Sequence, residues 1–181
     1  MAMGGNMDKK KEFLKDEFWS MAWNASVQHV VLYNKGAEQN QRKEFSNKVK
    51  AYMKSDIIPK YKGTVEESRH CENIRGLIEH AKRVGAGVLG EDRYNYGVAQ
   101  KLLNLALKYY WCLGLIKEPP HCPVDRKVIN KTDLRGKGVK WTRIKTETEY
   151  LNIVSAIKSK AEEDKCSIAQ WELKVWKSNN Y

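Results

Sequence analysis

The fold prediction depends most on Tyr96–Val128, which reads YGVAQKLLNLALKYYWCLGLIKEPPHCPVDRKV. Its first half repeats apolar side chains at the three- and four-residue spacing of an α-helix. Because these side chains extend almost all round the helix axis, the pattern predicts a buried helix that begins near Val98. A proline-rich connection follows, and a second, shorter helical pattern begins after Asp125. The stretch therefore predicts a buried helix whose start lies near the start of a second helix.

Two charged residues lie at these predicted helix beginnings. Lys101 is expected in the first turn of the buried helix, where the helix dipole opposes a positive charge. Burial also disfavours the charged amine, so both effects would lower the pKa of Lys101, as a nucleophilic amine requires. Asp125 directly precedes the second helix and is expected to cap it. Taken singly, each residue also fits a structural role, as a solvated lysine and as a helix cap.

The two short motifs that contain these residues resemble the helix-hairpin-helix DNA glycosylase superfamily. In its lysine-bearing 8-oxoguanine branch, which includes archaeal-type enzymes, Gly-Val-Gly-x-Lys opens the second hairpin helix and Pro-Val-Asp follows downstream. Here Gly97–Lys101 reads GVAQK, with Ala99 in place of the second glycine, and Pro123–Asp125 reads PVD. The resemblance implies a hairpin at about residues 74–113, an active-site cleft, Lys101 as nucleophile and Asp125 as the essential carboxylate.

The resemblance also implies a reaction. A glycosylase flips the target nucleotide out of the duplex; Asp125 would stabilise the positive charge that develops on the sugar, and Lys101 would attack C1′ and form a Schiff base. The substrate would be a modified base, such as 8-oxoguanine or the glucosylated hydroxymethylcytosine that anti-phage members of the superfamily remove. A non-catalytic helix-hairpin-helix DNA-binding module and an unrelated helical protein with a basic surface remain as alternatives.

Further residues are candidates for contacts with the substrate. Aromatic and amide side chains near the motifs or at element ends are candidates for the base pocket, although core packing is the favoured role for any one aromatic residue; these are Trp23, Gln28, Tyr94, Trp111 and Trp141. The backbone around residues 90–99 and nearby cations are expected to hold DNA phosphates; these contacts are assigned to Lys82, Arg83, Arg93, Gly97 and Ala99.

Composition supports a nucleic-acid partner. The chain has 181 residues, with 33 Lys and Arg against 22 Asp and Glu and a formal net charge of +11. A charge of this size favours polyanions, and we expect a monomer that binds double-stranded DNA. No apolar run approaches the roughly 20 residues that span a bilayer, so no membrane contact is expected.

The cysteine and histidine patterns predict neither a cofactor nor a metal. No two of the four cysteines form a CxxC motif, and without a signal peptide we expect reduced thiols in the cytoplasm. Some relatives carry an iron–sulfur cluster bound by four cysteines near the C-terminus, where this chain has only Cys166. The histidines show no metal-binding spacing.

The rest of the chain also predicts helices. Residues 1–10 are expected to be disordered, and residues 11–181 to form one domain. In the first third of the chain we expect helices over Lys11–Met21, over a segment from Val27 capped by Asn24 or Ser26, and over a segment through Phe45 and Met53. Further helices are expected over Thr64–Val84, with a capping box at Thr64, and over Glu147–Glu162. A last helix is expected to be capped by Ser167. Because no segment alternates as a strand does, the sequence predicts an all-α fold.

Overall fold

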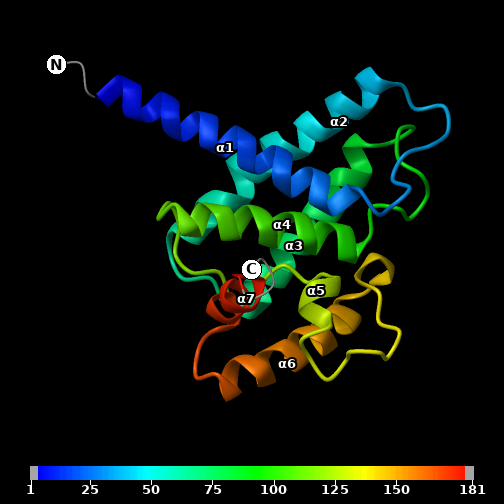
Figure 1. Cartoon of the computed structure of the whole chain (residues 1–181). Coiled ribbons are helices and arrows are strands. Elements are labelled where there is room, and N and C mark those ends of the chain that lie inside the picture. Colours follow the sequence, from blue (N-terminus) through cyan, green and yellow to red (C-terminus); the bar gives the residue numbers. More distant parts are fainter. Residues whose placement is uncertain (1–3, 178–181) are drawn as a thin grey trace.

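The computed structural model describes residues 4–177, and it confirms the all-α prediction (Figure 1). Within these residues the only β-structure is an isolated bridge between Tyr33 and Leu89. In chain order the helices are α1 (Gly4–Val27), α2 (Gln39–Tyr52), the π-helical turn η1 (Met53–Ile57), the 3₁₀ turn η2 (Ile58–Lys62), α3 (Glu67–Val84), α4 (Tyr96–Cys112), α5 (Arg126–Ile129), the 3₁₀ turn η3 (Trp141–Arg143), α6 (Glu147–Glu163) and α7 (Ile168–Lys177).

Helix α4 occupies the centre of the molecule. Every residue from Tyr96 to Leu107 is buried, because α1 lies along one side of the helix while α3, η3 and α6 cover other sides (Figure 1). A helix enclosed in this way must be apolar nearly all round, which is the pattern that the sequence shows. Among residues 4–177, none of the helices has the combination of length and apolarity that crossing a membrane requires.

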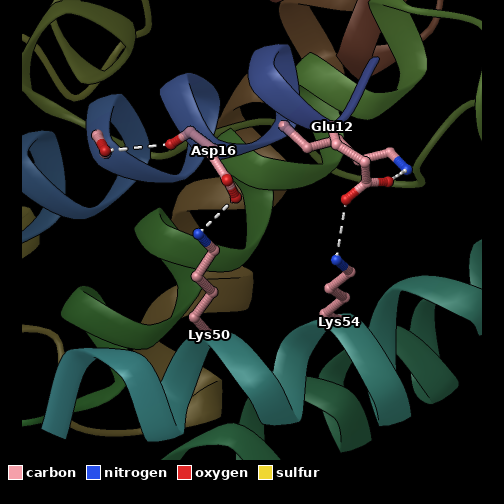
Figure 2. A network of polar contacts seen from close by, with 6 residues as sticks. Glu12, Asp16, Lys50 and Lys54 are labelled. Atoms are coloured by element: carbon pink, nitrogen blue, oxygen red, sulfur yellow. Dashed lines mark hydrogen bonds and ion pairs between the residues drawn. The ribbon is translucent and has the colours of Figure 1, made fainter. Parts of the chain in front are cut away.

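Helix α1 packs on α4 through aromatic residues and contacts α2 through charges. The ring of Phe18 stacks on that of Tyr109 with centroids 4.9 Å apart. On its other side, α1 forms ion pairs with the next helices, from Asp16 to Lys50 at 2.6 Å and from Glu12 to Lys54 at 3.1 Å (Figure 2). Because exposed ion pairs contribute about 1 kcal/mol or less each, the aromatic packing holds the helix and the ion pairs orient it.

The start of the chain is more helical than predicted. Helix α1 already covers residues 4–10, where disorder was expected, and residues 1–3 lie outside the described part of the chain. No proline or glycine follows Gly5 before the buried part of the helix, so the helix extends back from that part without interruption. Asn24 and Ser26 lie inside α1 and cap nothing; the Ser26 hydroxyl donates to the carbonyl of Ala22 at 2.7 Å.

The predicted second helix from Val27 is wrong. After α1 the chain turns and runs extended beside the glycine-rich turn that precedes α4. The Asn34 amide donates to the carbonyl of Val88 at 2.9 Å, and the Gly90 amide donates to that of Leu32 at 3.0 Å. β-branched Val30 and Val31 are weak helix formers, and pairing with the later turn satisfies the backbone here. The next helix, α2, therefore begins only at Gln39.

The later helices agree with the sequence prediction apart from one cap and the start of α4. Helix α3 ends at Val84 as predicted, but Glu66 rather than Thr64 precedes its first turn. The Thr146 side chain accepts from the amide of Glu149 at the start of α6. The Ser167 hydroxyl accepts from the amide of Gln170 at 3.1 Å, which confirms the predicted cap of α7.

Candidate active site

The start of α4 lies earlier than predicted, and this changes the environment of Lys101. Asn95 is the N-cap, and its side-chain oxygen accepts from the amide of Val98 at 3.1 Å. Because α4 begins at Tyr96, Lys101 lies in the second turn rather than the first. The helix dipole acts mainly within the first turn. Burial, rather than the dipole, therefore lowers the pKa of Lys101, and the nearby Asp125 charge opposes that shift.

Lys101 and Asp125 face each other across the gap between α4 and α5. The Lys101 Nζ atom lies 4.0 Å from Oδ2 of Asp125, and the two side chains are 6% and 15% exposed. The other oxygen of Asp125, Oδ1, accepts from the amide of Val128 at 3.1 Å, which confirms the predicted helix cap. One carboxylate oxygen is thus held by the helix while the other faces the amine.

The ring of Trp141 covers the other side of the amine, with its centroid 4.1 Å from Lys101 Nζ. The backbone beside Trp141 is fixed to the start of α4. Asn95 donates to the carbonyl of Thr142 at 2.9 Å, and the Gly97 amide donates to that of Ile144 at 3.0 Å. A Cβ atom on Gly97 would lie 1.9 Å from the Trp141 carbonyl oxygen, so only glycine permits this approach. Of the aromatic residues predicted near the site, Trp141 is the one that contacts Lys101.

Gln100 connects the two motifs, and the sequence reasoning missed this role. Its side chain is fully buried. The amide nitrogen donates to the carbonyl of Val124 at 2.8 Å, and the side-chain oxygen accepts from the Val124 amide at 3.1 Å. The available signal was a polar pair, Gln100 and Asn104, spaced by four residues inside an otherwise apolar helix. Such a pair predicts a buried polar contact on one helix face.

A buried polar network continues from Gln100 to the proline-rich connection. Asn104 donates to Gln100 at 3.3 Å and to the Tyr150 hydroxyl at 3.1 Å. The same hydroxyl lies 2.9 Å from Nδ1 of His121, whose Nε2 lies 3.0 Å from Glu67. Burial lowers the pKa of His121 and the Glu67 carboxylate opposes this shift. The network holds His121 and the connection that leads to Asp125.

A second buried amine lies two turns beyond Lys101 on the same face of α4. Lys108 forms an ion pair with Glu172 of α7 at 2.8 Å, and Nζ also lies 4.8 Å from the Trp176 ring centroid. Burial raises the pKa of the Glu172 carboxyl, Lys108 opposes this, and the charge of Asp125 acts in the same direction as burial. Helix α7 therefore places Glu172 close enough to Asp125 for the two carboxylate charges to interact.

Other predicted base-pocket residues lie elsewhere. Trp23 and Tyr94 are buried in the core, each against Phe45. Trp111 is in the last turn of α4, about 15 Å along the helix from Lys101 at 1.5 Å per residue. Gln28 is exposed after the end of α1, where its backbone amide donates to the carbonyl of Asn24 at 3.0 Å and its side chain forms no hydrogen bond within residues 4–177. The packing alternative is correct for Trp23 and Tyr94, because their rings complete the contact between α1, α2 and the turn before α4.

The predicted phosphate contacts have partners within the protein. Lys82 lies 3.5 Å from Asp92, Arg83 lies 3.1 Å from a ring nitrogen of His80, and Arg93 donates to the carbonyl of Val31 at 2.7 Å. The backbone prediction also needs correction, because the Gly97 amide donates to Ile144 and the Ala99 amide donates to Asn95 within the helix. Because α4 starts earlier than predicted, the Ala99 amide is bonded within the helix and the Gly97 amide is bonded to the loop before α6, so neither is a free donor.

Comparisons with protein-family models, with curated proteins and with solved structures find no match for this chain. Within residues 4–177, no group of three or more His, Cys, Asp or Glu side chains is placed to hold a metal ion. The geometry around Lys101 is therefore the main indication of function.

Proposed function

We propose that this protein is a DNA N-glycosylase in which Lys101 and Asp125 act on the sugar of a flipped nucleotide. One observation carries the proposal: a buried lysine amine of lowered pKa lies 4.0 Å from a carboxylate at a helix start. A lysine becomes nucleophilic when desolvation lowers its pKa, and a carboxylate nearby stabilises developing positive charge. The order of the GVAQK and PVD motifs supports the same function.

The reaction follows from these two groups. The free amine of Lys101 attacks C1′, the N-glycosidic bond breaks, and the base leaves with the bonding electron pair and takes up a proton. Ionised Asp125 stabilises the positive charge on the sugar during this step. Loss of a proton from the attached amine and opening of the sugar ring then give a Schiff base. Removal of a C2′ proton from this intermediate expels the 3′ phosphate and cleaves the strand.

The proposed substrate is a modified base in double-stranded DNA, and the proposed active form is a monomer. Both 8-oxoguanine and glucosylated hydroxymethylcytosine fit the chemistry, because neither changes the C1′ centre that Lys101 would attack. Trp141 lies against the amine and offers a wall for a flipped nucleotide.

The direct test is release of the base. Purified protein is incubated with duplexes that contain 8-oxoguanine or glucosylated hydroxymethylcytosine, and the free base is measured by mass spectrometry. We expect release from one of these duplexes and none from the unmodified duplex. Duplex binding without release from either substrate would favour the alternative, a non-catalytic DNA-binding module.

A further inference from the structure

The segment from the start of α5 to the residue before the N-cap of α6 carries an unusual set of charges. Eight cations and a single acid, Asp133, lie between Arg126 and Lys145. All eight are exposed, and none forms an ion pair or donates a side-chain hydrogen bond within the described residues. We call these residues the basic segment; its cations are Arg126, Lys127, Lys131, Arg135, Lys137, Lys140, Arg143 and Lys145.

Cations elsewhere are neutralised more often by the protein itself. Arg75 pairs with Glu147, and Lys160 pairs with Asp133, the one acid of the basic segment, at 3.4 Å. The predicted phosphate ligands near the hairpin also have internal partners. Within the segment, Lys145 lies near the Glu149 carboxyl, whose pKa is lowered first by backbone amides and also by Lys145. Lys127 lies over the ring of Trp176, with Nζ 4.1 Å from the ring centroid. The remaining six cations keep their charge available to an external anion.

One part of the basic segment, around Trp141, lies against Lys101. Lys140 and Arg143 flank Trp141 and Thr142, which are fixed to the start of α4 by the contacts of Asn95 and Gly97. Gly136 and Gly138 adopt positive φ angles of 77° and 73°, a backbone conformation that suits glycine and turns the chain between these cations. In Figure 1 the segment comprises α5 and the yellow loop between α5 and α6, remote from the start of α1.

The apolar residues of the basic segment face inward. Trp141 and Ile144 are buried, and Leu134 and Val139 are half-buried. The segment therefore presents charge without an apolar side chain that could insert into a lipid surface. An array of separate, exposed cations suits a chain of regularly spaced phosphates.

We propose that the basic segment, rather than Lys82, Arg83 and Arg93, binds the phosphodiester backbone of double-stranded DNA. Lys137, Lys140 and Arg143 lie within four residues of Trp141, as does Lys145, which is set aside because it lies near the Glu149 carboxyl. A strand bound there passes beside Trp141 and presents its nucleotides to Lys101. Only this last step rests on the proposed glycosylase function; binding of the backbone does not require it.

The test compares two variants that lose equal charge. In the first, Lys137, Lys140 and Arg143 are all changed to Gln. In the matched control, Lys9, Lys10 and Lys11 at the exposed start of α1 are changed to Gln. Binding of an unmodified DNA duplex is measured by fluorescence anisotropy over a series of salt concentrations, and thermal unfolding checks that both variants fold. The single variants Lys140→Gln and Arg143→Gln repeat the test with smaller changes.

Each lost phosphate contact reduces the slope of log K against log salt by about 0.9. We expect the basic-segment variant to lose about 2 to 3 units of slope and at least about tenfold in affinity at low salt, while the control keeps the wild-type slope. Equal losses in both variants, or an unchanged slope in the first, would overturn the proposal. Binding to phosphatidylserine vesicles without binding to duplex DNA would also overturn it. If the slope changes as expected but no modified base is released, the surface stands and the proposed enzyme activity fails.

Discussion

Gln100 and Val124, the residues immediately before Lys101 and Asp125, are joined by two hydrogen bonds. The side-chain amide of Gln100 pairs with both the carbonyl and the amide of Val124, at 2.8 and 3.1 Å. The contact sets the position of the Asp125 carboxylate relative to the Lys101 amine and links the two motifs into one site.

Replacing Gln100 tests whether this contact supports the site. Gln100→Leu leaves the buried Val124 amide and carbonyl without their partner, and each unmet buried polar group costs about 1–3 kcal/mol. We expect the free energy of unfolding, measured in urea, to fall by at least about 1–3 kcal/mol. Gln28→Leu is the matched control, because Gln28 is exposed, and it should change stability by about 0.5 kcal/mol or less. Equal effects of the two substitutions would show that the Gln100 contact is unimportant.

Gly97→Ala tests the close approach of η3 to α4. The added Cβ would lie 1.9 Å from the backbone oxygen of Trp141, so the chain carrying Trp141 must move. Strain of this kind typically costs about 1–3 kcal/mol, and we expect Gly97→Ala to lower the melting temperature accordingly. Gly36→Ala, where nothing lies within 4 Å, is the control. Full stability of Gly97→Ala would mean that Trp141 is not held against α4.

The sequence predicted the parts of the site that follow local rules. The cap at Asp125 and the burial of the α4 face that carries Lys101 follow from residue pattern alone, and both are observed. The Gln100 contact and the Lys108–Glu172 pair were missed, because each joins segments that are distant in the chain. Periodicity does not reveal which distant backbone group a buried polar side chain will meet.

The wrong helix prediction after α1 had a related consequence. Arg93 was predicted to bind phosphate because it lies near the predicted hairpin, and the folded chain brings the Val31 carbonyl within 2.7 Å of it. That carbonyl belongs to the extended segment which the sequence had predicted as helix. The misassigned element therefore also hid the internal partner of Arg93, because that partner depends on where residues 28–38 run.

Removal of the Asp125 charge should lower the pKa of Lys101 further. The carboxylate stabilises the ammonium form and opposes the effect of burial, so Asp125→Asn removes the opposing influence. The pKa can be measured by NMR of lysine labelled with ¹³C at Cε, with the signal assigned by its loss in Lys101→Arg. Asp133→Asn, which removes an exposed carboxylate beside Lys160, is the control and should leave the Lys101 pKa unchanged. A higher Lys101 pKa in Asp125→Asn would contradict the geometry.

The burial of His70 leads us to expect that the folded protein loses stability in mild acid. His70 is fully buried, Nδ1 lies 2.7 Å from the Tyr61 hydroxyl, and burial lowers its pKa well below the ordinary value of 6.5. The unfolded chain then binds a proton that the folded protein excludes, so stability is complete above about pH 6.5 and falls below it. The slope should reach about 1.4 kcal/mol per pH unit for this group.

His70→Phe removes this titration and should flatten the dependence of the unfolding free energy on pH between about 6.5 and 5. Part of the slope will remain, because burial lowers the pKa of His121 as well. Exposed His29 supplies the control as His29→Gln, which should keep the wild-type slope. An unchanged slope in His70→Phe would show that His70 does not become charged on unfolding.

Borohydride trapping tests the central claim most directly, because it detects the covalent bond between Lys101 and the sugar. Wild-type protein is incubated with a duplex that contains the modified base and then reduced, and the adduct is located by peptide mass spectrometry. We predict an adduct on Lys101 and none in Lys101→Gln. In Asp125→Asn, adduct formation should be slower by about 10²–10³-fold, the usual effect of one electrostatic stabiliser. An adduct of equal yield in Lys101→Gln, or one located on another amine in the wild type, would contradict Lys101 as the nucleophile.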